Sequence, residues 1–249
     1  MAFQTVFKRY EIKYMLTLEQ KEKILNAMQD YMALDKYGRS SIRNVYFDTD
    51  NYRLIRRSID KPAYKEKLRI RSYGRPKNEN GRVFVELKKK YDHVVYKRRL
   101  DLPCNTAFDW ASGKTCCPQN TQISREIEYF LSYYETLHPA AFLSYEREAY
   151  FDKSGGSFRV TFDDTILFRQ NELTLLSDAY GEPLLEDGKV LMELKCAGGL
   201  PLWLVKVLSE EKIYKTSFSK YGTGYTRFIL PNINKNSGTI QEKKYASLT

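Results

Sequence analysis

Hydrophobic and charged side chains alternate along much of the chain. Val83, Val85 and Leu87 are apolar, whereas Glu86 and Lys88 among them are charged. A period of two is that of a β-strand, because successive side chains point to opposite faces. Such segments, bounded by turn residues, predict eight strands over residues 4–15, 41–48, 63–73, 82–90, 93–102, 141–152, 157–169 and 189–196.

Helical segments separate some of these strands. Thr17 and Gln20 have the spacing of a capping box, which predicts a helix from residue 17 to about Met32. Further helices are expected over residues 50–58, 119–137 and 201–212. We therefore predict one α+β domain over residues 1–230, built around a large antiparallel sheet or barrel with helices packed on its outside. Residues 231–249 are polar, lack periodicity and are expected to form a tail.

Basic residues are concentrated on the charged faces of these strands. The chain has 249 residues with 41 Lys and Arg against 31 Asp and Glu, a net charge of +10. Its 42% hydrophobic and 14% aromatic residues are enough for a core and exclude a disordered chain. Seven strands place twelve basic and four acidic residues on their charged faces, a difference of +8. They are Arg9, Lys13, Lys65, Lys67, Arg69, Arg71, Lys88, Lys97, Arg99, Arg147, Arg159 and Lys195, with Glu11, Glu86, Asp163 and Glu193.

Two interpretations of this charged face are open. An antiparallel sheet commonly turns one polar face to water. However, neighbouring like charges repel, so a strongly basic face also fits a sheet curved around a bound anion. Arg offers bidentate contacts to phosphate oxygens and Lys a compact charge, which favours a phosphate-rich ligand.

The acidic residues on this face also have two interpretations. Glu86 and Asp163 fit ion-pair partners of the surrounding cations as well as ligands of a divalent cation. Glu11 and Glu193 are the better metal candidates, because each lies two residues from a Lys on the same face. Ser219 and Lys220 precede two glycines and fit either a plain loop or part of a site.

Several classes of site and of location are not supported. No P-loop or dinucleotide-binding glycine motif occurs, and two His cannot form a His-rich metal site. The four Cys lack zinc-binding spacing. No apolar run reaches the length of a membrane span, and the first residues lack the apolar core of a secretory signal, so a cytoplasmic location is expected.

Eight segments, in order along the chain, resemble the VTC-type polyphosphate polymerase domain, a branch of the CYTH-like triphosphate tunnel metalloenzymes. They are RYEIKY (9–14), KLRIRSY (67–73), VFVELKKK (83–90), VVYKRR (94–99), SYEREAY (144–150), FRVTFDD (158–164), LMELK (191–195) and SFSKYGTGY (217–225). The resemblance implies an antiparallel β-barrel whose closed tunnel, lined by Lys, Arg and Glu, binds the triphosphate of ATP and a growing polyphosphate chain. It also implies a divalent metal, Mn²⁺ or Mg²⁺.

Carried over by position, the resemblance implies a set of site residues. The catalytic set is Lys13, Arg69, Arg71, Lys88, Lys97, Arg147, Arg159, Lys195 and Lys220. Substrate binding falls to Tyr145 and Ser219, with Lys67 and Arg99 beside them on the charged faces. Glu193 matches the metal-holding glutamate, and Glu11 is added from the alternation.

The sequence departs from the family pattern at two positions. Arg9 stands where the wider superfamily has the first acidic residue of an ExExK pattern, and Ser217 stands where the polymerase branch commonly has a Lys. The loss of a carboxylate argues against typical two-metal triphosphatase or adenylate-cyclase chemistry.

These observations predict a metal-dependent polyphosphate polymerase that uses ATP. A tunnel triphosphatase and a non-catalytic polyphosphate-binding module are the alternatives. Nucleic acid is not expected as a partner, because a closed lumen of Arg and Lys excludes duplex. Export of a product through a membrane would need a separate partner.

Overall fold

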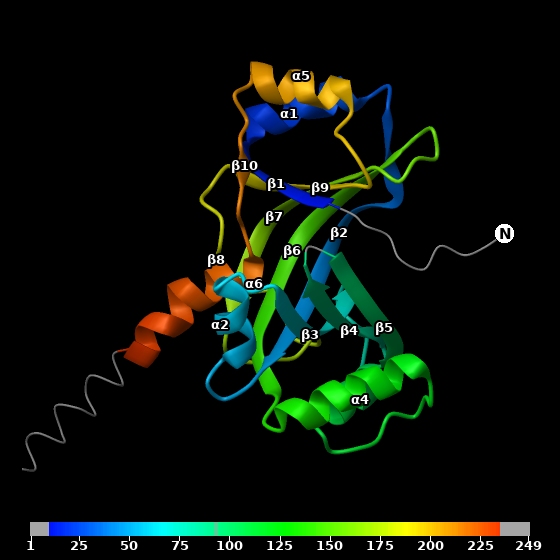
Figure 1. Ribbon diagram of the computed structural model, residues 1–249, viewed down its shortest axis with the longest axis vertical. Helices are drawn as coiled ribbons and strands as arrows, with labels where there is room; N and C mark the ends of the chain where they lie inside the picture. Colours follow the sequence, from blue (N-terminus) through cyan, green and yellow to red (C-terminus); the bar gives the residue numbers. More distant parts are fainter. Residues whose placement is uncertain (1–9, 93, 235–249) are drawn as a thin grey trace, which may run out of the picture.

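One large antiparallel sheet dominates the computed structural model, which describes residues 10–92 and 94–234 (Figure 1). Together with the six α-helices found within these residues it confirms the α+β class. The strands are β1 (Tyr10–Thr17), β2 (Met32–Asp48), β3 (Tyr64–Tyr73), β4 (Arg82–Tyr91), β5 (Val94–Pro103), β6 (His138–Asp152), β7 (Arg159–Arg169), β8 (Glu182–Pro183), β9 (Lys189–Cys196) and β10 (Lys215–Thr216).

The sheet is curved but not closed. Its strand order is β10-β1-β9-β7-β6-β2-β3-β4-β5, with β8 paired to β7. Among the described residues no strand pairing joins β1 or β10 to β5, so the described part of the sheet is not closed into a barrel by hydrogen bonds. Side chains span this gap instead: Lys88 Nζ lies 3.5 Å from Glu11 Oε2, and Lys67 Nζ 3.4 Å from Ser219 Oγ.

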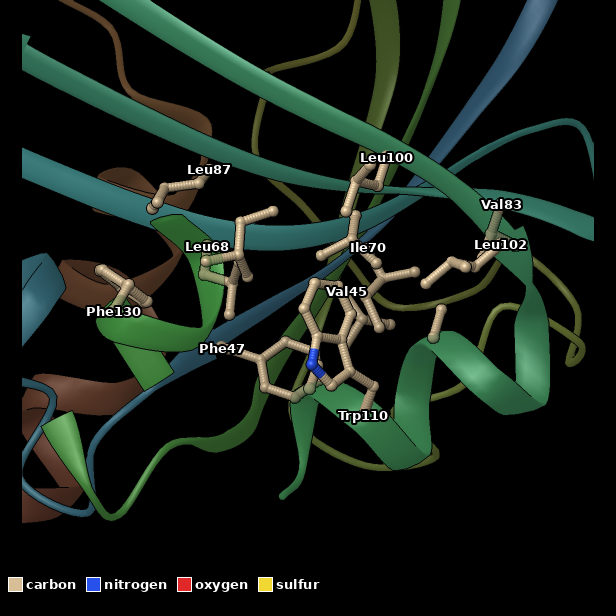
Figure 2. Packing of buried hydrophobic residues seen from close by; sticks show 14 of the residues in the cluster. Val45, Phe47, Leu68, Ile70, Val83, Leu87, Leu100, Leu102, Trp110 and Phe130 are labelled. Atoms are coloured by element: carbon tan, nitrogen blue, oxygen red, sulfur yellow. The ribbon is translucent and has the colours of Figure 1, made fainter. Parts of the chain in front are cut away.

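The apolar face of the sheet is covered by two pairs of helices. Helices α3 (Cys104–Ala111) and α4 (Gln122–Tyr134) cover β3, β4 and β5, where Leu68, Val83 and Leu87 are fully buried together with Trp110 (Figure 2). Helices α1 (Leu18–Met28) and α5 (Leu202–Glu210) cover β1, β7 and β9. The alternation therefore predicted the buried face correctly.

The other face, which carries the predicted cations and is called the inner face here, is partly covered as well. Helix α2 (Arg53–Ile59), α6 (Lys220–Gly224) and the π-helical turn η1 (Tyr225–Ile229) pack there. Tyr221 and Tyr225 lie in one apolar cluster with Leu143, Phe168 and Leu191. One end of the inner face is thus filled, which differs from the expectation that all helices pack outside.

The end of the described chain is helical. Residues 230–234 continue the helix that follows η1, although the sequence predicts a tail from residue 231. The remainder of that predicted tail, 235–249, lies outside the described residues. No helix within residues 10–92 and 94–234 is both long and apolar enough to cross a membrane.

Gly224 is the point of closest approach between α6 and the sheet. A Cβ at this position would lie 2.2 Å from Cδ2 of Phe168, so Gly224→Ala should lower the free energy of unfolding by about 1–3 kcal/mol, as overpacking does. Urea unfolding measures this. Gly198→Ala is the control, since no atom lies within 4 Å of its added Cβ, and it should be near neutral. Equal effects of the two substitutions would contradict the packing described.

Candidate functional site

A cavity of about 470 Å³ opens on the inner face. It lies between β1 and β9 on one side and β3, β4 and β5 on the other, with α6 at its filled end. The structure brings thirteen of the fifteen predicted site residues to its wall, and Arg99 and Arg159 are the exceptions. The thirteen are Glu11, Lys13, Lys67, Arg69, Arg71, Lys88, Lys97, Tyr145, Arg147, Glu193, Lys195, Ser219 and Lys220.

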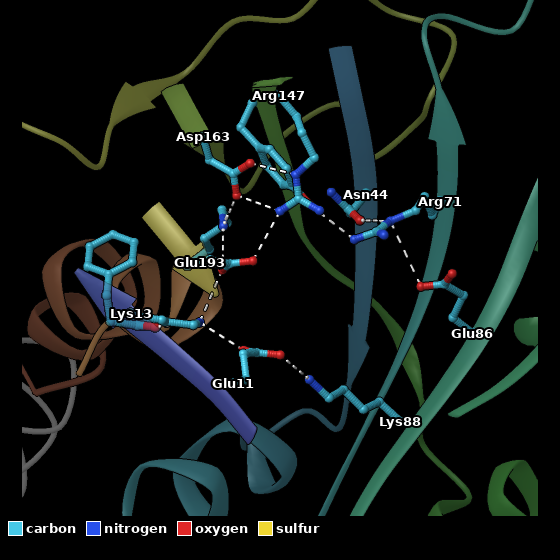
Figure 3. Close-up of polar contacts among 12 residues, drawn as sticks. Glu11, Lys13, Asn44, Arg71, Glu86, Lys88, Arg147, Asp163 and Glu193 are labelled. Carbon is cyan, nitrogen blue, oxygen red and sulfur yellow. Dashed lines mark hydrogen bonds and ion pairs between the residues drawn. The ribbon is translucent and has the colours of Figure 1, made fainter. Parts of the chain in front are cut away.

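Two carboxylates organise the cations on the β6, β7 and β9 side of the cavity (Figure 3). Asp163 accepts hydrogen bonds from Arg147 at 2.5 and 2.6 Å and from Lys220 at 2.6 Å. Glu193 lies 3.1 Å from both Arg147 and Lys220, and 3.3 Å from Lys13. Burial favours a neutral Glu193, but Lys220, Lys13 and Arg147 outweigh it and hold the pKa of Glu193 well below its usual range.

A third carboxylate, Glu86, organises the β3, β4 and β5 side. It is 1% exposed, and Arg69 and Lys97 each approach it to 2.7 Å. Arg99 also pairs with Glu86 and donates to the hydroxyl of Tyr73 at 2.9 Å, which keeps Arg99 out of the cavity wall. Arg71 lies farther from Glu86, at 3.9 Å. Glu86 and Asp163 are therefore ion-pair partners in this structure.

Tyrosine hydroxyls fix two of the arginines. Tyr145 accepts a hydrogen bond from Arg71 at 3.1 Å, and its ring lies 4.5 Å from Lys220 Nζ. Tyr46, which the sequence analysis missed, accepts from Arg69 at 2.9 Å. Burial would raise the pKa of Tyr46, but the nearby positive charges, Arg69 foremost, lower it to about 8.

Several lysines in the cavity lack full neutralisation. Burial lowers the pKa of Lys67 to about 8, and burial also lowers that of Lys97 to about 8 although Glu86 opposes it. Burial, followed by the charge of Arg147, lowers the pKa of Lys195, and no carboxylate within the described residues lies in ion-pair distance of its amine. The cavity thus has more cations than carboxylates, and burial disfavours the positive charge of some of its lysines. Such a cavity is suited to binding a multivalent anion.

Arg159 lies outside the cavity wall. It is exposed, pairs in register with Lys195 on β9, and stacks over the ring of Phe151 at 5.5 Å. The predicted role of Arg159 in phosphate binding therefore stays a prediction for a ligand that extends beyond the cavity. Arg9 lies outside the described residues.

The donor set fits a divalent metal only if the substrate supplies further ligands. No cluster of three or more His, Cys, Asp or Glu able to hold a metal occurs in the described part of the chain. Glu11 and Glu193 are both near the amine of Lys13, at 3.4 and 3.3 Å. Mg²⁺ is typically held by one or two carboxylates together with phosphate oxygens and water. Glu193 and Glu11 fit this arrangement, with phosphate oxygens completing the coordination.

The affinity of the cavity for tripolyphosphate without metal should fall as the pH rises above about 8. Lys67 and Lys97 lose their charge there, so affinity should drop on the order of tenfold per pH unit for each lysine that titrates. At pH 8 binding should take up protons, which calorimetry in two buffers of different ionisation enthalpy detects. The Lys67→Arg, Lys97→Arg double variant should flatten the profile. An unchanged affinity across this pH range in the unmodified protein would contradict the lowered pKa of Lys67 and Lys97.

Comparisons with known proteins agree with this geometry. The family model described as the VTC domain matches residues 8–229. No curated protein matches the chain. A candidate adenylate cyclase from Bacillus halodurans has a similar structure, with a TM-score of 0.52, 14% identity and coverage of 90% of this chain and 97% of that one.

A second similar structure comes from Hippeastrum. It is a candidate adenylyl cyclase described as having a dominant triphosphatase activity, with a TM-score of 0.52, 15% identity and coverage of 87% of this chain and 94% of that one. At these identities the likeness concerns the fold, which is that of the CYTH-like triphosphate tunnel proteins. With the family model matching nearly the whole described chain, this protein belongs to the VTC domain family.

Proposed function

We propose that this protein is a metal-dependent polyphosphate polymerase that transfers the terminal phosphoryl group of ATP to a growing phosphate chain. Membership of the VTC family and the tunnel fold support a phosphoryl-transfer enzyme more broadly. The observation that carries the finer proposal is the surplus of Lys and Arg over carboxylates in the wall of the 470 Å³ cavity. Two consecutive polyanions, a triphosphate and a chain end, would together neutralise it.

The proposed reaction needs little covalent chemistry from the protein. A terminal oxygen of the chain attacks the γ-phosphorus of ATP, the bond from that phosphorus to the β–γ bridging oxygen breaks, and ADP leaves with the electron pair. Positioning and stabilisation of charge on the transferred group dominate such reactions. Arg147 and Lys220 are held rigidly by Asp163, which makes them suited to that role.

Other residues of the cavity bind and orient the two substrates. Arg69 and Arg71 are fixed by Tyr46, Glu86 and Asn44 and present planar donors to phosphate oxygens. A divalent metal held by Glu193, with Glu11 nearby, would neutralise charge on the bridging phosphates when bound.

The direct test is incubation of the purified protein with ATP and Mn²⁺ or Mg²⁺, followed by assays for ADP, for long phosphate chains and for free phosphate. The polymerase predicts ADP and chains in matched amounts, with or without a short polyphosphate primer. Free phosphate as the dominant product would establish a triphosphatase instead. Tight binding of polyphosphate without any turnover would identify a binding module.

A further inference from the structure

The gap between the two edges of the sheet opens directly into the cavity. We define this seam by Glu11 of β1 on one side and by Lys88 of β4 with Val95, Tyr96 and Lys97 of β5 on the other, all of which line the cavity. Strands β1 and β5 lie toward opposite ends of the strand order, and among the described residues no backbone hydrogen bonds join them.

Within residues 10–92 and 94–234, only side chains connect the two sides of the seam. The Lys88–Glu11 contact is long, at 3.5 Å, and its two side chains are 42% and 31% exposed. Ion pairs of this kind contribute about 0–1 kcal/mol. Lys67 and Ser219 form a second contact at 3.4 Å. A phosphate oxygen offers Lys88 a stronger partner than a partly exposed carboxylate at this distance, so an arriving phosphate chain can replace Glu11.

The filled end of the inner face limits the other routes by which a phosphate chain could enter or leave the cavity. Leu143, Phe168 and Leu191 with Tyr221 and Tyr225 occupy the space beyond the cavity. A chain that enters cannot continue through that end. The rest of a long chain must therefore leave through the mouth of the cavity or lie in the seam.

We propose that the cavity takes up phosphate chains side-on through this seam, so that an internal stretch of a long polyphosphate binds without an end threading in. The inference rests on the proposed function in one respect, that polyphosphate is the ligand. Two cations on the β4 and β5 side of the seam, Lys88 and Lys97, are 42% exposed and reach the chain before it enters. Every internal phosphate of such a chain presents the same charge, so binding does not require an end. The chains that bind thus include long chains whose ends are blocked.

The test uses one size-selected polyphosphate, without metal so that no turnover occurs. Both terminal phosphates are coupled to biotin, and half of the sample is capped with streptavidin, which is far larger than the cavity. Side-on loading predicts that the capped and uncapped chains bind with Kd values within about threefold of each other, less than 1 kcal/mol. Loss of binding by the capped chain, with the uncapped chain still bound, overturns the inference and leaves the proposed function intact. No binding of either chain counts against polyphosphate as the ligand.

A cross-link across the seam tests where the capped chain binds. Tyr10 of β1 and Tyr96 of β5 are exposed and both line the cavity. A Tyr10→Cys, Tyr96→Cys variant, in which the accessible Cys116 and Cys117 are also replaced by Ser, can therefore be joined by a flexible bismaleimide. The cross-linked and open forms of the same variant are compared, so that the loss of two tyrosines cancels. Closing the seam should weaken binding of the capped chain relative to the uncapped chain by at least about tenfold, or 1.4 kcal/mol. An unchanged ratio would show binding through another route and overturn the inference.

Discussion

Glu86→Gln should destabilise the protein more than removal of any single charge that lines the cavity, by about 3–5 kcal/mol. Glu86 is buried and pairs with Arg69, Lys97 and Arg99, with Arg71 nearby. Glutamine keeps the shape of the side chain but leaves these cations without their counter-charge. Urea unfolding at neutral pH measures the loss.

Two further readouts separate this electrostatic effect from a general loss of packing. Tripolyphosphate should stabilise the variant more than the wild type, because the anion replaces the missing carboxylate. Glu66→Gln is the matched control: Glu66 is also buried, but it accepts hydrogen bonds from Tyr64 and Tyr134, and no cation pairs with it among the described residues. It should show a smaller loss and no additional rescue. Equal rescue of both variants would argue against the counter-charge role of Glu86.

Because of Glu86, the free energy of unfolding of the wild type should decrease at acid pH. Burial would raise the pKa of Glu86, but Arg69, Arg71 and Lys97 together lower it far below 4.5. A group with a depressed pKa in the folded state stabilises the fold above its ordinary pKa, and this contribution disappears as the pH falls through the folded-state value. Unfolding measured below about pH 4.5 should therefore show a steeper loss in the wild type than in Glu86→Gln.

Glu193→Gln should lower turnover by at least about a hundredfold while triphosphate binds as tightly as before or more tightly. Removal of a negative charge beside Lys13, Arg147 and Lys220 strengthens attraction for an anion. Under the proposed function the substitution also removes a metal ligand, and with it stabilisation of the transition state worth several kcal/mol. Initial rates with ATP and calorimetric titration with tripolyphosphate give the two quantities separately.

The control for Glu193 is Glu148→Gln. Glu148 is also partly buried and ion-paired, to Lys21 at 2.5 Å, but it does not line the cavity. It should change neither rate nor affinity appreciably. Thermal unfolding in tripolyphosphate verifies that both variants are folded under assay conditions. If Glu193→Gln retained full turnover, the metal-ligand role of Glu193 would be wrong.

The local part of this structure was accessible from the sequence. Lys67, Arg69 and Arg71 face the cavity while Leu68 and Ile70 lie in the core, because a period of two is set by the strand itself. The capping box at Thr17 and Gln20 was likewise predicted and is present. Each of these features depends on residues close together in the chain.

The missed features depend on distant residues or on local irregularities. Strand β2 starts at Met32 rather than 41 because its first residues, which lack alternation, pair with the end of β6. Helix α3 was missed because Pro103 precedes it without a side-chain cap. A bulge near Thr165, which has a φ of 47°, places Phe168 on the same face as Asp163.

The open seam and the role of Tyr46 are two further features that were not predicted from the sequence, because both depend on residues far apart in the chain. Whether β1 meets β5 is decided by the curvature of the whole sheet, which no segment encodes by itself. Tyr46 gave a signal that could have been used, since Asn44, Tyr46 and Asp48 alternate with Val45 and Phe47. Its role as the acceptor for Arg69 depends on the register between β2 and β3.

The apolar filling beneath α6 bears on the size of the product. A chain that lengthens by one phosphate against a fixed floor can only shift outward, toward solvent. No dimension of the protein then limits the length of the product chain. Under the proposed reaction, the distribution of chain lengths is set by competition between addition and dissociation, and it should respond to ATP concentration rather than to the depth of the cavity.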